Sequence, residues 1–376
     1  MPGGFAVPGC LSLCAGCARE SSPELPLVRP EVVDAFRAQI VGCRKAGSEL
    51  TARLMERCVA ELEAGGPLAK LLEGWQGHPL LDALPQRVVG AVQGLALEGR
   101  APELERFYPS LGGTPVWPDT ADAFARVIER HGAEIRPRLD TQVQTNEVRR
   151  CAALLGGFLA AARRTGGLPL RLLEIGSSAG LNLFWDRYRY RLGPHRWGDP
   201  GAAVELDAEW RGGPPDLAAP VRVASRLGCD LFPLDVRDAA QLRRIESFLW
   251  ADQPDRHRLL RAAAAALPAQ GAPLERMGAR EFLARELATP VRGATTLLFH
   301  SVMWWYLPDA DRKAVQACVV SAGERADAAA PLAWLRMEPP NVEYCEVRLR
   351  VWPGGEDALL ARTHPHGKWV EWLGAS

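Results

Sequence analysis

A buried apolar segment followed by a glycine turn is the stretch of the chain best suited to ligand chemistry. Residues 172–183 run LLEIGSSAGLNL, with Glu174 two residues before Gly176 and a second glycine at Gly180. This order predicts a strand, a tight turn and the start of a helix. Glycines at such a turn allow left-handed backbone and a close approach of ligand to main-chain N–H groups.

The type of turn narrows the class of ligand. The dinucleotide fingerprint G-x-G-x-x-G is not matched, and no Gly-Lys-Ser/Thr follows as in a P-loop. The acid before the turn favours S-adenosylmethionine, with Glu174 at the amino-acid end of the cofactor and Gly176, Ser178 and Gly180 in the loop around it. Ser178 stands where a glycine is usual, which predicts either a narrower pocket or weaker binding of the ligand.

The next strand of such a sheet should end in an acid that accepts the ribose hydroxyls. An acidic segment at residues 203–208, followed by Glu209, is expected to be that strand, and Asp207 falls nearest its end. Glu205 and Glu209 are the alternatives. The residues after a third strand, 279–281, occupy the place where a side chain often contacts adenine.

A second segment for chemistry is the apolar run TTLLFHS at residues 295–301. Its composition fits a central strand buried on both faces. His300 then lies at the carboxyl end, where open α/β sheets bind ligands, and could serve as a general base. A satisfied core histidine is the alternative. Trp304 and Tyr306 follow and would wall a dry pocket around a sulfonium methyl or a substrate ring.

A polar stretch at residues 142–150 precedes the glycine motif. Asn146 and Glu147 would either contact the substrate from a helical cap or tie that cap to the sheet.

Histidines and cysteines suggest two metal alternatives. His364 and His366 lie two residues apart in a turn and could join His300 in a metal-dependent hydrolase, although no H-E-x-x-H motif supports it. Cys10, Cys14 and Cys17 have the C-x3-C-x2-C spacing that holds an iron–sulfur cluster in radical S-adenosylmethionine enzymes; a leader with chance cysteines is the alternative. We predict no metal site as the main interpretation.

Composition limits the function classes. The 45 basic and 45 acidic residues give a formal net charge of zero, which argues against a general nucleic-acid binder. No apolar run reaches the length of a membrane span, and no positive segment marks a signal peptide. The other six cysteines are scattered, as in reduced cytoplasmic proteins. We therefore expect a cytoplasmic protein acting on a small molecule.

Apolar periodicity predicts two parts. Residues 1–30 look like a disordered leader, and residues 31–165 form a helical cap domain. Residues 166–376 form a doubly wound, mainly parallel α/β sheet with a helical insertion at about 236–270. Helices are expected at 31–39, 48–64, 85–97, 120–131 and 139–162. Strands are expected at 170–175, 203–208, 274–278, 295–301 and 332–337, with a closing hairpin of 346–352 and 358–363.

These segments together resemble a bacterial family known as domain of unknown function 2332. The resemblance rests on QTNE at 144–147, LEIGSSAGLNL at 173–183, DRYRY at 186–190, FHS at 299–301 and HPHG at 364–367. It covers most of residues 105–373. It implies a Rossmann-like fold similar to class I methyltransferases, without an established activity, and residues 1–30 would be an addition to the family's usual start.

The residues favour an S-adenosylmethionine-dependent methyltransferase for an unidentified small molecule, with His300 beside the methyl group. A non-catalytic Rossmann-like binding or regulatory protein is the main alternative. Ser178 in place of glycine, and the lack of an Asn/Asp-Pro-Pro-Tyr motif after residue 299, favour that alternative.

Overall fold

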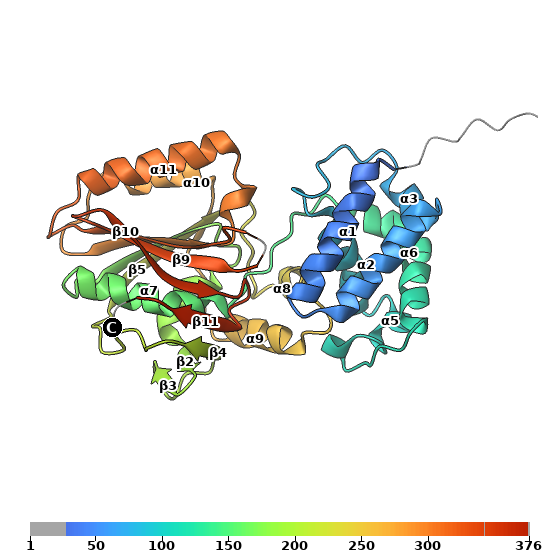
Figure 1. Cartoon of the computed structure of the whole chain (residues 1–376), viewed down its shortest axis with the longest axis horizontal. Helices are drawn as coiled ribbons and strands as arrows, with labels where there is room; N and C mark the ends of the chain where they lie inside the picture. The colour runs from blue at the N-terminus through green and yellow to red at the C-terminus, as the bar shows by residue number, and fades with distance from the viewer. Residues whose placement is uncertain (1–27, 342, 375–376) are drawn as a thin grey trace, which may run out of the picture.

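The described part of the chain starts with a layer of helices and continues into a large mixed sheet (Figure 1). The computed structural model describes residues 28–341 and 343–374. The elements of the first part, called here the helical layer, are α1 (Pro30–Lys45), α2 (Glu49–Glu63), α3 (Pro67–Leu72), α4 (Leu84–Leu97), α5 (Pro102–Glu105), η1 (Pro109–Leu111) and α6 (Asp119–Arg138). Within the described residues, no helix is long and apolar enough to cross a membrane.

The helical layer has a hydrophobic core of its own. Each longer helix contributes one apolar face, including the fully buried Phe36, Leu54, Leu95 and Phe124. The start of α2 follows from the sequence, because the Ser48 hydroxyl accepts a hydrogen bond from the Thr51 amide at 3.3 Å.

The helix expected at residues 139–162 begins only at residue 150. Residues 139–149 instead form a connection between α6 and α7 (Arg150–Arg164), which is the first helix of the second part. The reason lies at Asn146, whose φ of 37° is left-handed and whose side chain is bonded to another loop. Tertiary hydrogen bonds therefore outweigh the helical preference of this segment.

The second part contains an 11-stranded sheet in the order β3-β2-β4-β11-β10-β9-β8-β7-β1-β5-β6. Most pairings are parallel; β2–β3, β8–β9, β9–β10 and β10–β11 are antiparallel. The strands are β1 (Leu170–Ile175), β2 (Arg189–Leu192), β3 (His195–Trp197), β4 (Glu205–Arg211), β5 (Val223–Asp230), β6 (Leu274–Arg276), β7 (Thr295–Ser301), β8 (Leu332–Glu338), β9 (Cys345–Trp352), β10 (Glu356–Thr363) and β11 (Trp369–Trp372).

The five parallel strands β6-β5-β1-β7-β8 position the candidate site. From β1 the chain moves outward to β5 and β6, then returns to the other side of β1 for β7 and β8. Glu174 at the end of β1 lies between Gly228 of β5 and Phe299 of β7. The predicted strands at 170–175 and 295–301 are confirmed, as is the hairpin formed by β9 and β10.

The predicted second strand exists, but the prediction that it lies beside β1 is wrong. Residues 203–208 overlap β4, which pairs with β2 and β11 near the far edge of the sheet. The strand beside β1 is β5, which sequence periodicity missed because Arg226 interrupts its apolar pattern. That charge is tolerated because the Arg226 guanidinium forms an ion pair of 2.5 Å with Asp186 and donates to the Leu183 carbonyl at 2.9 Å.

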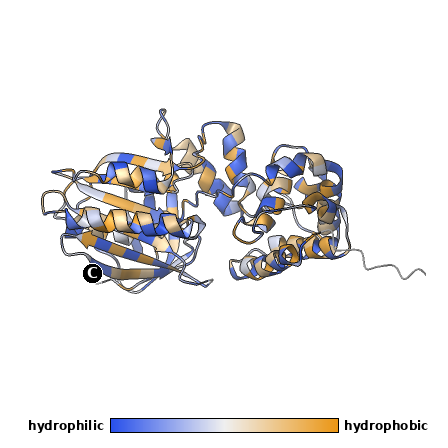
Figure 2. Ribbon diagram, turned by 90° about the horizontal axis from the view of Figure 1, so that it is seen from above, coloured by the Kyte–Doolittle hydropathy of each residue, from blue (hydrophilic) through white to orange (hydrophobic). Residues whose placement is uncertain are grey.

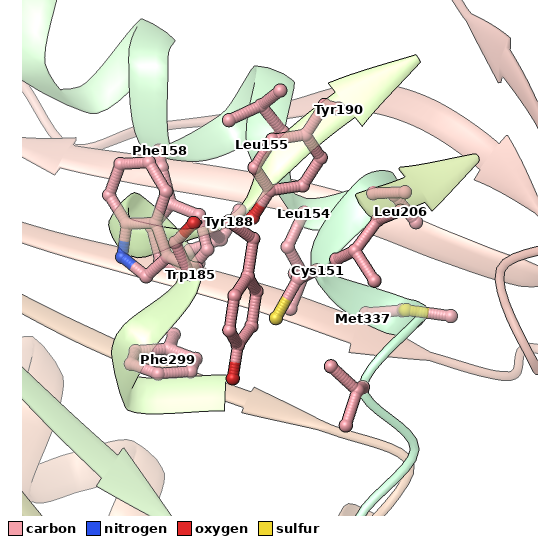
Figure 3. Close-up of a cluster of buried hydrophobic side chains, with 14 of the residues drawn as sticks. Cys151, Leu154, Leu155, Phe158, Trp185, Tyr188, Tyr190, Leu206, Phe299 and Met337 are labelled. Atoms are coloured by element: carbon pink, nitrogen blue, oxygen red, sulfur yellow. Dashed lines mark hydrogen bonds between the residues drawn. The ribbon is translucent and has the colours of Figure 1, made fainter. Parts of the chain in front are cut away.

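No α-helix follows the glycine turn. The chain forms a 3₁₀-helix, η2 (Leu181–Arg187), and then runs through β2, β3 and β4 before β5. Tyrosine hydroxyls take backbone carbonyls that an α-helix would use: Tyr188 donates to Leu181 at 2.7 Å and Tyr190 to Trp185 at 2.6 Å. Figure 3 shows Trp185 beside Phe158 of α7, with ring centroids 4.2 Å apart.

Helices cover both faces of the sheet (Figure 1). The helix α7 packs with η2 on one face, whereas α10 (Ala279–Glu286) and α11 (Asp309–Glu324) pack on the other through Phe282 and Val319. The two views show the helical layer beside the sheet along the longest axis (Figure 2).

The segment at 236–270 is helical as predicted and joins the two parts. It holds α8 (Ala239–Ser247) and α9 (Pro254–Ala265). The Gln93 side chain of α4 donates to the Glu246 and Leu249 carbonyls at 3.1 and 2.6 Å. Asp252 accepts from the Ser48 hydroxyl at 2.6 Å, so this insertion fixes the helical layer to the strand ends.

Candidate functional site

The glycine turn after β1 has the left-handed backbone that the sequence predicts. Gly176, Ser178 and Gly180 have φ values of 65°, 55° and 70°. Ser178 holds this conformation although a serine side chain disfavours it. Its amide donates to the Asp230 carboxylate at 2.8 Å and its carbonyl accepts from the Leu234 amide at 3.0 Å. The turn is therefore held by the end of the neighbouring strand β5 and by the segment that follows it.

Backbone strain gathers around this turn. Among the described residues, four that are not glycine have positive φ, and three of them border the site: Asn146, Ser178 and Val302. Val302 is the most unusual of these residues, because a β-branched side chain rarely allows a backbone φ of 52°. It follows β7 directly. Such strain persists only where surrounding contacts enforce it, and it concentrates at ligand sites.

Glu174 is the buried acid of the site. It is 3% exposed, and its Oε2 atom has no hydrogen-bond partner among the described residues. Burial, and secondarily the charge of Asp230, raise the pKa of Glu174 well above its usual value. The side chain is thus poised to accept a donor or a cationic group that would restore its ionised form.

Asp230 is a site residue that the sequence analysis did not assign. It ends β5, so it lies at the same edge as Glu174, and it accepts hydrogen bonds from the amides of Ser178 and Phe232 and from the Gln144 side chain. The available signal was the acid directly after the buried pair Gly228-Cys229. The broken apolar pattern of β5 concealed that signal.

The structure does not bring Asp207 to the site. Asp207 lies on β4 opposite Arg191, and its side chain is 55% exposed. Its nearest cations, Arg149 and Arg191, are each 3.9 Å away. The prediction that Asp207 ends the strand beside β1 is therefore corrected: the chain inserts three strands between η2 and β5, and Asp230 takes that position. Glu205 and Glu209 lie on β4 as well.

Asn146 and Glu147 tie the connection to its surroundings. The Asn146 carbonyl oxygen Oδ1 accepts from the amides of Ala179 and Leu181, both at 3.2 Å. Glu147 is 3% exposed and bonds the Arg256 guanidinium of α9 at 2.6 Å. The sequence left open whether Asn146 and Glu147 contact the substrate or tie the cap to the sheet. Their contacts fit the second role.

His300 lies beneath an aromatic cover at the end of β7. The residue is fully buried, its Nδ1 is 2.7 Å from Glu338, and its ring stacks on Trp304 with centroids 5.2 Å apart. Glu338 also accepts from the amides of Met303 and Trp304. A carboxylate at Nδ1 selects the tautomer with Nε2 as acceptor, and Nε2 has no partner among the described residues.

A pocket of about 390 Å³ opens beside these residues. It is lined by Leu231, directly after Asp230, by the start of α10 at residues 278–281 and by Tyr306. Leu231 is 55% exposed and Tyr306 is 44% exposed, so both apolar surfaces are accessible. Residues 279–281 therefore line the pocket, at the place where the sequence analysis put contacts to adenine.

The three histidines do not form a ligand set. Within the described ranges, no group of three or more His, Cys, Asp or Glu side chains is placed to hold a metal ion. The His364 ring accepts at Nδ1 from the His366 amide, whereas His300 is bonded to Glu338. The hydrolase alternative thus loses its three-histidine basis. Cys10, Cys14 and Cys17 lie outside the described residues.

Comparison with known proteins gives one match. The family described as "Uncharacterized protein conserved in bacteria (DUF2332)" matches residues 33–372. The chain belongs to this family. No curated protein and no solved structure matches the chain. The family match spans the helical layer as well as the sheet, so in DUF2332 the two parts occur together.

Proposed function

We propose that this DUF2332 protein is an S-adenosylmethionine-dependent methyltransferase with a Rossmann-like sheet, acting on a small molecule. The observation that carries the proposal is a pair of acids, Glu174 and Asp230, at the ends of adjacent parallel strands on either side of a left-handed turn. Glu174 lies at the end of β1, the strand beside which the strand order reverses, since the chain moves from β1 to β5 and β6 on one side and returns to β7 on the other. Open α/β sheets bind nucleotide-like ligands at this point.

The residues present fit the cofactor. Glu174 Oε2 and Ser178 Oγ are buried polar atoms without partners among the described residues, and a bound ammonium or hydroxyl group would satisfy them. Asp230 is the acid for the ribose hydroxyls. The pocket of Leu231 and residues 278–281 offers an apolar seat for adenine. Gly176 and Gly180 complete the loop of the cofactor site.

Bound S-adenosylmethionine would supply an electrophilic methyl group. The chain's contribution is positioning and the exclusion of water. Trp304 and Tyr306 stand beside the strand end and would shield the reacting groups. His300 Nε2 is the atom that would accept a proton from the nucleophile, while Glu338 holds the ring through Nδ1. Trp304 covers His300, so this role requires η3 (Trp304–Tyr306) to move when substrate binds.

The test is calorimetric titration with S-adenosylmethionine and S-adenosylhomocysteine. The unaltered protein should bind with a micromolar dissociation constant, or about −8 kcal/mol. Asp230→Asn keeps the size of the side chain but removes a charged acceptor, so affinity should fall by at least about tenfold. Asp207→Asn is the matched control on the distant strand and should leave affinity unchanged.

Two results would overturn the proposal. One is the absence of binding to either compound by protein whose unfolding transition is intact. The other is an equal effect of the two aspartate substitutions, which would show that the acid at the end of β5 has no special part. Transfer of labelled methyl groups from the cofactor to a metabolite in cell extract, abolished by Asp230→Asn, would establish catalysis.

A non-catalytic ligand-binding protein is the second candidate. Two observations favour it: His300 has no exposed surface, and Asp230 already accepts three hydrogen bonds. Cofactor binding without any methyl transfer from extract metabolites would support this candidate over the enzyme.

A further inference from the structure

Three partly buried arginines on different elements lie near the candidate site. Arg87 lies on α4, Arg150 at the start of α7 and Arg244 on α8. None of the three forms an ion pair within the described residues, whereas Arg138, Arg256 and Arg261 do. Burial lowers the pKa of all three. Removing a guanidinium group from water without a counter-ion is costly, and a bound anion would offset that cost.

Arg150 is the most enclosed of the three. Its Nε donates to the Pro365 carbonyl at 3.0 Å and its Nη1 to the Ser301 carbonyl at 3.1 Å, which fixes the guanidinium at the end of β7. The nearby acids are already bonded elsewhere: Glu147 to Arg256, and Glu338 to His300. The charge of Arg150 is therefore oriented by carbonyls and not neutralised by an ion pair.

Arg87 reaches the same region from the helical layer. Its Nη1 donates to the Leu139 carbonyl at 2.8 Å, and its Nε is buried without a partner among the described residues. Tyr306 links it to Arg150: desolvation raises the pKa of Tyr306, whereas the charges of Arg150 and Arg87 lower it. Both guanidinium groups thus act on the residue that lines the pocket.

Arg244 stands on the other side, next to Asp230. Its Nη2 donates to the Gln144 carbonyl oxygen at 3.3 Å, and Gln144 in turn donates to Asp230. Its Nε is buried and unpartnered among the described residues. Asp230 is engaged by two backbone amides, so it does not neutralise Arg244 by direct pairing. At Arg87, the negative charges of Asp82 and Asp140 raise the pKa of the guanidinium and so oppose the effect of burial.

We propose that Arg87, Arg150 and Arg244 bind an anionic group, a carboxylate or a phosphate, of the molecule on which the protein acts. The assignment to a substrate rests on the proposed function. Arg87 belongs to the helical layer, whereas the glycine turn and its acids belong to the sheet, so we assign the anion to the substrate and not to the cofactor. Guanidinium groups are suited to oxyanions because their N–H groups form a planar fork.

The test uses inorganic phosphate and acetate as separate probes on the full chain. Each is added at constant ionic strength against chloride, and the thermal midpoint is followed, because a ligand of the folded state raises it. Arg87→Gln and Arg244→Gln should each raise the concentration for a half-maximal shift by about tenfold or more. Arg243→Gln, which alters the adjacent residue of α8 near Glu98, is the matched control.

The outcomes separate this inference from the proposed function. A shift by phosphate or acetate that needs Arg87 and Arg244 and persists in saturating S-adenosylhomocysteine supports it, and the stronger probe identifies the anion. If S-adenosylhomocysteine abolishes the shift, the arginines hold the cofactor carboxylate and the substrate assignment falls. Equal responses to chloride, or equal effects of Arg243→Gln and Arg244→Gln, overturn the anion site while leaving cofactor binding untouched.

Discussion

The buried ion pair between Glu147 and Arg256 offers the sharpest test of how the connection before α7 is held to α9. The two side chains are only 2% and 4% exposed, and Glu147 Oε2 is 2.6 Å from Arg256 Nε. Glu147→Ala would leave the guanidinium buried, with Gln253 as its remaining side-chain hydrogen-bond partner at 3.0 Å. Loss of one member of such a pair costs about 3–5 kcal/mol.

Urea unfolding of Glu147→Ala, Arg256→Met and the double variant measures this cost. The double variant should be less destabilised than the sum of the two single variants, because no charge stays buried alone. The exposed pair Asp255–Arg258 on the same helix is the control, with side chains 65% and 73% exposed. Asp255→Ala should cost less than about 1 kcal/mol. A Glu147→Ala cost no larger than this would refute the buried junction.

Three further predictions concern pH and the glycine turn. Burial, aided by the Lys368 charge, lowers the pKa of His364 to about 4. As the pH falls below about 6.5, the unfolded chain therefore binds a proton at this histidine before the folded protein does. The free energy of unfolding should fall between about pH 6.5 and 4, and it should fall less in His364→Asn. Ser178→Gly relieves a left-handed serine and should raise the unfolding free energy by about 1 kcal/mol in urea titrations; no gain would mean that its contacts offset the strain. Gly180→Ala would place Cβ 2.7 Å from the Ala272 Cβ and should lower the thermal midpoint more than Gly112→Ala, where the added atom meets nothing within 4 Å; equal losses would contradict the close packing.

Helix α2 and strand β7 show how much of the fold the local sequence pattern predicts. Apolar spacing and Ser48 locate α2, and the continuous apolar run locates β7, because these elements bury one stripe or both faces in the way their residues suggest. Glu174, the turn and its two glycines could also be predicted from the sequence, because positions with left-handed backbone favour glycine.

What tertiary structure alone decided is which strand stands beside β1. The apolar pattern of β5 is broken by Arg226, and only its ion pair with Asp186 explains why that strand is central. Likewise, η2 replaces an expected helix because Asn146 and two tyrosine hydroxyls take its backbone groups. Local propensity contains no record of partners that lie distant in sequence.

The residues of the candidate site also divide into those that the sequence predicts and those that only the tertiary structure brings together. The sequence by itself was enough to predict that Glu174 lies at the end of a strand before a glycine turn, and that His300 lies at the end of β7. Each of these features belongs to one continuous segment. The pairing of Glu174 with Asp230, and the approach of arginines from α4, α7 and α8, depend on strand order and on the docking of the helical layer. Those are properties of contacts between segments, which only the folded chain specifies.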